Sequence, residues 1–342
     1  MTPRRPAAGR APMRAALAAF ALALGLAAAG PAAAGPAERW RYAWPETDFD
    51  RHAVPLSEIR SGGPPRDGIP PIEAPRFQPV EAARERLAAR DPVISLEIGG
   101  DARAYPLSIL IWHEIVNDTV GGTPVAVTYC PLCNTGIVFE RVVNDAVTTF
   151  GTTGKLRHSD LVMYDRATES WWQQYGGRAI VGAMTGAELD AVPARMEAFA
   201  DFAERRPGGR VLRPPEGVRR AYGRNPYEGY ARSARPFLYD GRYDGPGSPL
   251  MRVVTVPGRA EAWSLALLRE KGTLRTGDLE LGWCPGQASA LDSARIADGR
   301  DVGSVTVTRV GGDGTRRDVV HMVPFAFAFR AFNPGAPIHH PE

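Results

Sequence analysis

The sequence predicts a β-rich α+β fold built from two related half-units, in which short helices pack on mostly antiparallel sheet. Short runs of alternating apolar and polar residues outnumber helical patterns along the chain. The 37 glycines and 31 prolines among 342 residues favour many turns over long helices. A weak internal repeat relates residues 102–110, ARAYPLSIL, to residues 260–268, AEAWSLALL. This repeat is the reason to expect two halves.

The composition is that of a soluble globular protein. Hydrophobic residues make up 44% and charged residues 23% of the chain, which excludes a disordered chain, a coiled coil and a polytopic membrane protein. Of the 41 basic residues, four arginines lie in residues 1–34; without them 37 basic residues face 38 acidic ones. No basic patch in the sequence points to nucleic acid, so we expect no nucleic-acid partner.

The N-terminus has the pattern of a signal peptide. Basic residues end at Arg14, the apolar stretch AALAAFALALGLAAA follows, and small residues precede an expected cleavage near Ala34. A retained anchor is the alternative, but the stretch is short for a span of about 20 residues. We therefore expect a periplasmic or secreted protein with no stable membrane span after cleavage, in a compartment where disulfides persist.

The remaining chain divides into an extension and two unequal halves. Proline and glycine dominate the extension, where one helix is predicted from Pro79 to Arg90. The predicted boundaries are 1–34 for the signal peptide, 35–90 for the irregular extension, 91–245 for the first half-unit and 246–342 for the shorter second one.

Local patterns predict the elements of the first half-unit in order. Alternation predicts strands, proline predicts a helix start, and Asn144-Asp145 predicts a hairpin turn. The predicted strands are 93–100, 124–130, 135–143, 146–150, 160–165 and 170–175; the predicted helices are 106–115 and 196–206; and residues 213–250 are predicted to form a loop.

The repeat aligns two cysteines. One predicted strand ends in Tyr129-Cys130-Pro131 and another in Trp283-Cys284-Pro285. Gln287 stands where the first half has Cys133, so only the first half carries a cysteine pair. We expect Cys284 to be a buried core residue, because a free cysteine at the end of an apolar strand behaves as a small hydrophobe. The alternative is that it serves as a third ligand or partner of the pair.

The pair Cys130 and Cys133 is the strongest chemical feature. Two thiols three residues apart can close a small disulfide or bind a soft metal. A disulfide across so short a loop adds little stability, which favours a reactive or ligating role. The leading hypothesis is a thiol redox protein that could act as a thiol oxidoreductase. Cys130 would be the attacking thiol, Cys133 the thiol that resolves the resulting mixed disulfide, and His113 the proton acceptor. Its partner would be an unknown periplasmic redox protein or a small molecule.

Two other functions stay open. The first is copper(I) binding by Cys130, Cys133 and Met163, with His113 and His158 as further candidates; the ligand count falls short of a structural zinc site. The second is a non-catalytic binding module in which the cysteine pair is a stiffening disulfide. Neither the redox nor the binding hypothesis requires a cofactor.

Two groups of residues, one near the cysteine pair and one in the run YDRATESWWQQ, are candidates for supporting the chemistry of that pair. Each group also has a purely structural interpretation, as hydrogen bonds that stabilise turns and helix ends or as packing in the hydrophobic core. In the second group Asp165 and Arg166 are expected to form a buried ion pair. The supporting residues are Asp118 and Tyr129 near the cysteine pair, and Asp165, Arg166, Ser170 and Trp171 in the run YDRATESWWQQ.

Several runs resemble a bacterial protein family, domain of unknown function 3179. They are WHEIVND, VAVTYCPLCNTGIVFERV, LVMYDRATESWWQQ and NPYEGY, within a likeness from about residue 50 to the C-terminus. Because some members are selenoproteins at the cysteine-pair motif, the resemblance implies redox chemistry at Cys130 or Cys133. His158 replaces the small polar residue expected there, and the second half lacks a YDR-like turn, so that half is expected to be scaffold.

Overall fold

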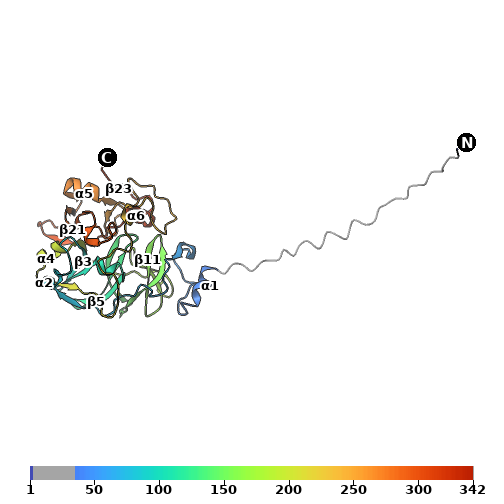
Figure 1. The fold of residues 1–342 in the computed structure, drawn as a ribbon, viewed down its shortest axis with the longest axis horizontal. Helices are drawn as coiled ribbons and strands as arrows, with labels where there is room; N and C mark the ends of the chain where they lie inside the picture. The colour runs from blue at the N-terminus through green and yellow to red at the C-terminus, as the bar shows by residue number, and fades with distance from the viewer. Residues whose placement is uncertain (3–34, 342) are drawn as a thin grey trace.

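The computed structural model describes residues 1–2 and 35–341 and shows a β-propeller-like arrangement of five small sheets within them (Figure 1). The predicted signal peptide, residues 1–34, lies almost entirely outside the described residues. In Figure 1 the C-terminal elements α5, α6 and β23 lie along one side of the body, and α2 and β5 lie on the other. The prediction of two half-units is therefore wrong, because five blades share the chain.

The five sheets contain three to five strands each, and their pairs are antiparallel except β4 with β16 and β18 with β23. Within each sheet the strands are given in the order in which they lie side by side. The first sheet contains β1 (Ile59–Ser61), β10 (Phe150–Arg157), β11 (Asp160–Asp165), β12 (Trp171–Gln173) and β13 (Arg178–Val181), and the second contains β14 (Ala191–Val192), β7 (Thr135–Glu140), β6 (Thr123–Cys130) and β5 (Ile115–Val120). The third contains β15 (Arg195–Ala198), β3 (Pro92–Ile98), β4 (Asp101–Pro106), β16 (Arg210–Leu212) and β2 (Phe77–Pro79); the fourth contains β17 (Val253–Thr255), β18 (Ala262–Ser264) and β23 (Ile338–His339); and the fifth contains β19 (Thr273–Thr276), β20 (Leu279–Cys284), β21 (Ser304–Val310) and β22 (Arg316–Asp318).

A two-stranded ribbon and short helices complete the described part of the chain. The ribbon pairs β8 (Val142–Val143) with β9 (Ala146–Val147). The helices are α1 (Pro36–Arg41), α2 (Val80–Ala83), α3 (Leu107–Leu110), α4 (Phe199–Arg205), α5 (Leu265–Lys271) and α6 (Ala326–Phe332), with 3-10 turns at Leu56–Glu58, Tyr230–Arg232 and Ile296–Asp298.

The internal repeat is a local unit and not a duplicated half. Both copies contain a strand that runs directly into a short helix, β4 into α3 and β18 into α5. The same unit recurs where β15 runs into α4 and where β2 runs into α2. The residues before these helices, such as Pro106 and Ser264, have extended backbone and start the helix at the sheet edge. Sequence similarity between the copies therefore reflects this shared turn.

Most predicted strands are confirmed, and all three predicted helices are too long: the one predicted over 196–206 begins only at α4, because residues 196–198 belong to strand β15. The Asn144-Asp145 hairpin forms, with φ of 49° and 62°, the left-handed pair that a type I′ turn needs. The helix predicted over Pro79–Arg90 shrinks to α2, and the one predicted over 106–115 stops at α3. In both cases the chain leaves the helix early and turns back into a strand, β3 after α2 and β5 after α3. Packing against the sheet therefore decides the length of these helices, and helix propensity does not.

The N-terminal extension is part of the sheets and not a loose cover. Its β1 pairs with β10, and its β2 pairs with β16. Trp44 and Phe49 meet Trp171 edge-on, with ring centroids 5.2 Å apart in both pairs. Trp171 is thus a core residue that anchors the extension. No helix among the described residues is long and apolar enough to cross a membrane.

Candidate functional site

The cysteine pair and one carboxylate meet in the interior of the molecule. Cys130 ends β6, Cys133 closes the turn before β7, and Asp160 begins β11 of the neighbouring sheet. The two sulfur atoms and a carboxylate oxygen of Asp160 all lie within 4.8 Å of one another. Both cysteines are free thiols, and all three side chains are at most 1% exposed. We name Cys130, Cys133 and Asp160 the dithiol–carboxylate cluster.

Hydrogen bonds hold the Asp160 carboxylate in place. It accepts from the Tyr175 backbone N–H at 2.8 Å, from Gln173 Nε2 at 2.6 Å and from the Thr135 hydroxyl at 3.2 Å. The Cys133 thiol also bonds to it. Among the described side chains, no lysine, arginine or histidine forms an ion pair with Asp160. The carboxylate is therefore buried and oriented, but its charge is not matched by a cation.

Burial suppresses ionisation throughout this cluster. It raises the pKa of Asp160 to about 6, and it raises the pKa of Cys130 and, more strongly, of Cys133. Glu114 lies close enough to be affected: burial first, and then Asp160, raise its pKa to about 8. Buried acids that face one another repel when ionised. A bound cation would remove that repulsion, whereas an attacking thiolate would have to form against it.

Strained backbone surrounds the cluster. Glu114, Asn134, His158 and Ser159 all have positive φ, from 52° to 66°. The Ser159 carbonyl accepts a 3.7 Å hydrogen bond from the Cys130 thiol. Asparagine and histidine are enriched in this conformation, whereas at Glu114 and Ser159 it costs on the order of 1–3 kcal/mol each. Such strain concentrates at sites where side-chain placement matters for function.

Two distant segments cover the cluster. The Tyr230 hydroxyl donates to the Leu132 carbonyl at 2.8 Å, and the Ser159 hydroxyl donates to the Phe237 carbonyl at 2.5 Å. From the C-terminal side, the Phe325 backbone N–H donates to the Cys133 carbonyl at 2.8 Å. Residues 213–250 are irregular, as the sequence predicts, but their part in closing the site had no signal in the sequence.

His113 is not free to accept a proton. Its Nδ1 lies 2.7 Å from the Pro70 carbonyl oxygen, and its Nε2 lies 2.8 Å from the Tyr222 hydroxyl. Both ring nitrogens are thus engaged, and burial lowers the pKa of the ring. His158 lies 3.5 Å from Glu58 and packs edge-on against Phe332.

Met163 and Tyr129 are buried near the centre of the core. Met163 is three residues from Asp160 along β11, so strand alternation directs the two side chains to opposite faces. Tyr129 precedes Cys130, and its hydroxyl is buried without a hydrogen-bond partner among the described residues. Burial strongly raises its pKa, while Arg252 acts in the opposite direction.

Asp118 belongs to a structural ion pair. Its carboxylate accepts from Arg103 Nη1 at 2.6 Å on both oxygens and from the Tyr105 hydroxyl at 2.6 Å. Both partners of the ion pair are nearly buried, with side chains 10% and 6% exposed. Asp118 therefore joins β5 to β4 and makes no hydrogen bond or ion pair with the dithiol–carboxylate cluster.

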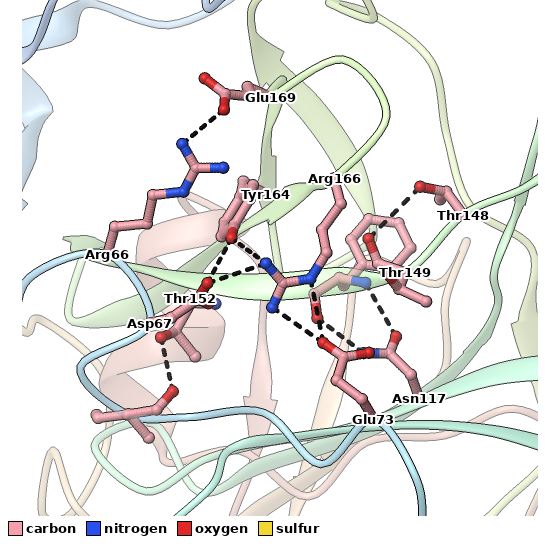
Figure 2. Close-up of polar contacts among 12 residues, drawn as sticks. Arg66, Asp67, Glu73, Asn117, Thr148, Thr149, Thr152, Tyr164, Arg166 and Glu169 are labelled. Atoms are coloured by element: carbon pink, nitrogen blue, oxygen red, sulfur yellow. Dashed lines mark hydrogen bonds and ion pairs between the residues drawn. The ribbon is translucent and has the colours of Figure 1, made fainter. Parts of the chain in front are cut away.

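Arg166 and its partners Asp67, Glu73 and Tyr164 join the N-terminal extension to β11 (Figure 2). Arg166 pairs with Asp67 at 3.0 Å and with Glu73 at 2.9 Å, and it donates to the Tyr164 hydroxyl at 2.5 Å. The expected Asp165–Arg166 ion pair is absent among the described contacts. Asp165 instead accepts from Trp172 Nε1, at 2.9 Å, and from Thr168, whose hydroxyl also bonds to that of Ser170.

Cys284 is exposed, so its prediction as a buried core residue is wrong. It ends β20, where its thiol lies 3.9 Å from the carbonyl oxygen of its cross-strand partner Ser304. Alternation predicts the strand correctly, but the open end of this sheet leaves the last side chain uncovered. Cys284 is not a member of the dithiol–carboxylate cluster.

Sequence reasoning missed Asp160 and Glu114. Asp160 stands at the first position of a predicted apolar strand. An acidic residue is rarely buried there without a partner, and this unusual position was the signal that could have identified it. Cys130 is thirty positions away and ends β6, in a different sheet from β11. The two side chains therefore meet only through contacts between the two sheets, such as the hydrogen bond from the Thr135 hydroxyl of β7 to Asp160.

The fold and the cluster define a β-propeller-like protein with a buried dithiol–carboxylate group. A family model matches residues 66–336, and the chain belongs to that family, whose description is "Protein of unknown function (DUF3179)". No curated protein and no solved structure matches the chain. The family resemblance inferred from the motifs is thereby confirmed.

Proposed function

We propose that the chain is a metal-binding protein in which Cys130, Cys133 and Asp160 hold one transition-metal ion. One observation carries the proposal: three metal-ligating atoms converge within 4.8 Å in the interior, and no cationic side chain of the described residues is paired to the carboxylate. Two thiolates and a carboxylate provide up to three negative charges. A divalent ion compensates most of them, and binding releases the protons that the free groups carry.

The donor set favours zinc(II) over copper(I). Zinc accepts cysteine sulfur together with carboxylate oxygen, and three protein ligands leave a fourth position for water or substrate. Copper(I) prefers thiolate and thioether sulfur, so a carboxylate is a poor match for it. The ligand set of this proposal replaces Met163 with Asp160.

The thiol redox hypothesis has one observation in its favour, the closeness of the two free thiols. Against it, both sulfur atoms are almost fully buried, burial raises both thiol pKa values, and His113 has no free ring nitrogen. A redox partner protein would have no direct path to the pair. The basic and apolar pattern of residues 1–34 supports the further proposal that the protein works after export.

The test is metal stoichiometry on the purified protein after chelation and reloading with zinc(II) or copper(I). We expect one zinc ion per chain in competition with a chromophoric chelator. Cys133→Ser and Asp160→Asn should each weaken binding at least about tenfold. Cys284→Ser is the matched control and should bind like the original protein. If no ion binds, and Cys130 and Cys133 instead oxidise reversibly to a disulfide, the redox hypothesis replaces this one.

A further inference from the structure

A hollow of about 540 Å³ is rich in arginine, and none of its lining residues belongs to the dithiol–carboxylate cluster. It is formed by the segment after α2, by the first part of the long loop (residues 213–250) and by the residues around the 3-10 turn Ile296–Asp298. Three guanidinium groups line it, those of Arg86, Arg224 and Arg295. This volume is in the range of sites for small organic molecules.

Two of these arginines lie directly opposite each other. Arg224 and Arg295 are partners in an isolated antiparallel bridge. Residues so paired have their Cβ atoms about 5 Å apart, and like charges in this position are destabilising. Arg224 makes no ion pair and no side-chain hydrogen bond with any described residue, and Arg295 forms a long, exposed ion pair with Asp298, at 3.8 Å. Asp298 therefore offsets part of the charge of Arg295, whereas Arg224 has no acidic partner among the described residues.

Arg86, from the segment after α2, adds a third positive charge. One of its nitrogens donates to the Leu212 carbonyl at 3.2 Å, and it has no ion pair with a described acidic residue. Burial, and then the nearby Arg213, lower its pKa. Arg213 itself, Arg219 and Arg220 also lack ion pairs within the described residues, so the surrounding field is positive.

The acidic residues at this hollow do not balance the arginines. They are Asp91, which accepts the Ala88 backbone N–H at 2.9 Å, and Asp298. Elsewhere arginines engage carboxylates closely, as Arg103 does with Asp118 at 2.6 Å. Tyr222 also lines the hollow. Its ring stacks on the ring of His113, and its hydroxyl lies 2.8 Å from Nε2 of His113. An occupant would thus lie beside the Tyr222 ring and the side chains of Arg86, Arg224 and Arg295.

We propose that this hollow is a binding site for a small organic anion that carries a phosphate or carboxylate group. The planar guanidinium fork matches both groups in a bidentate manner. An anion between Arg224 and Arg295 would turn their repulsion into two attractive contacts, while Arg86 adds a third positive charge. The site is independent of the metal proposal, since its residues do not overlap with the dithiol–carboxylate cluster.

The test is calorimetric titration and thermal unfolding of the full chain with inorganic phosphate and, separately, with citrate. We expect saturable binding of at least one of them, and the stronger of the two identifies the group that the site prefers. Arg224→Gln and Arg86→Gln should each weaken binding about tenfold or more. Arg235→Gln, at an exposed arginine of the long loop that does not line the hollow, is the matched control and should bind normally.

Two outcomes would overturn the proposal. One is a stabilisation by phosphate that sodium chloride reproduces at equal ionic strength. The other is an equal response of all variants. A further readout does not depend on the ligand chosen: without any added anion, Arg224→Gln should unfold at the same or a higher temperature than the original protein, because it removes the repulsion. A clear loss of stability would show that Arg224 has an unrecognised structural partner.

Discussion

The hydroxyl of Tyr230 donates a 2.8 Å hydrogen bond to the carbonyl oxygen of Leu132, which lies in the turn between Cys130 and Cys133. The same hydroxyl accepts a 3.2 Å bond from the Phe237 backbone N–H. One phenol from the long loop thus bonds to the cysteine turn and to the part of the loop that covers it. The burial of the two thiols depends on a segment about one hundred residues away in the sequence.

Tyr230→Phe should loosen this cover. The substitution keeps the ring but removes the hydroxyl, so the Leu132 carbonyl loses its partner at a cost of about 1–3 kcal/mol. We expect a lower free energy of unfolding and a several-fold faster reaction of Cys130 and Cys133 with a thiol reagent, since local opening becomes easier. Tyr42→Phe, at a side chain that is 98% exposed, is the control. Unchanged stability and unchanged thiol reactivity would contradict the role of Tyr230.

The native protein should present one fast thiol. Cys284 is exposed, whereas Cys130 and Cys133 are at most 1% exposed. Titration with a chromogenic disulfide should therefore show one rapid equivalent in native buffer and three in denaturant. Cys284→Ser should remove the rapid equivalent and change the free energy of unfolding by no more than about 0.5 kcal/mol, as is usual at the surface. Two or three rapid equivalents in the native protein would mean that the cluster is open.

The difference between Cys130 and Cys284 shows where sequence reasoning stops. Both are the last residue of an apolar strand and precede proline, and period-two alternation located both strands correctly. Alternation assigns a face to a side chain, but burial at the end of a strand depends on what covers it. Tyr230 and Phe325 cover the Cys130 turn, and these contacts span about one hundred residues or more. The pairing of β2 with β16, which puts the extension into a blade, is non-local for the same reason.

Asp118→Asn should destabilise the protein strongly. The carboxylate is nearly buried and accepts two bonds from Arg103, so its loss leaves the nearly buried guanidinium with Asp101 as its remaining ion-pair partner. Breaking a buried ion pair costs up to about 3–5 kcal/mol. Glu81→Gln, which breaks the exposed pair with Arg84, is the matched control and should cost less than about 1 kcal/mol. Urea unfolding measures both; similar small losses would show that the buried pair is not structural.

Stability should fall in acid partly through Asp101. Burial acts to raise the pKa of this carboxyl, but hydrogen bonds from Arg103, Arg210 and the Gly121 backbone N–H outweigh burial and lower the pKa to about 2. The unfolded chain has a value near 3.9. Because the folded-state value is the lower one, the stabilisation from Asp101 is fully present above about pH 4 and is lost as the pH falls toward 2.

Asp101→Asn tests this contribution. The variant should be less stable than the original protein at pH 5, and the difference should shrink as the pH falls from 4 to 2, because the original protein then loses the same charge by protonation. Urea unfolding at pH 5, 4, 3 and 2 gives both curves. The control is Asp145→Asn in the exposed β8–β9 turn, a carboxylate without a guanidinium partner among the described residues, and its curve should run parallel to that of the original protein. A constant difference between Asp101→Asn and the original protein over the whole range would mean that the Asp101 charge does not stabilise the fold, and that the variant acts through packing alone.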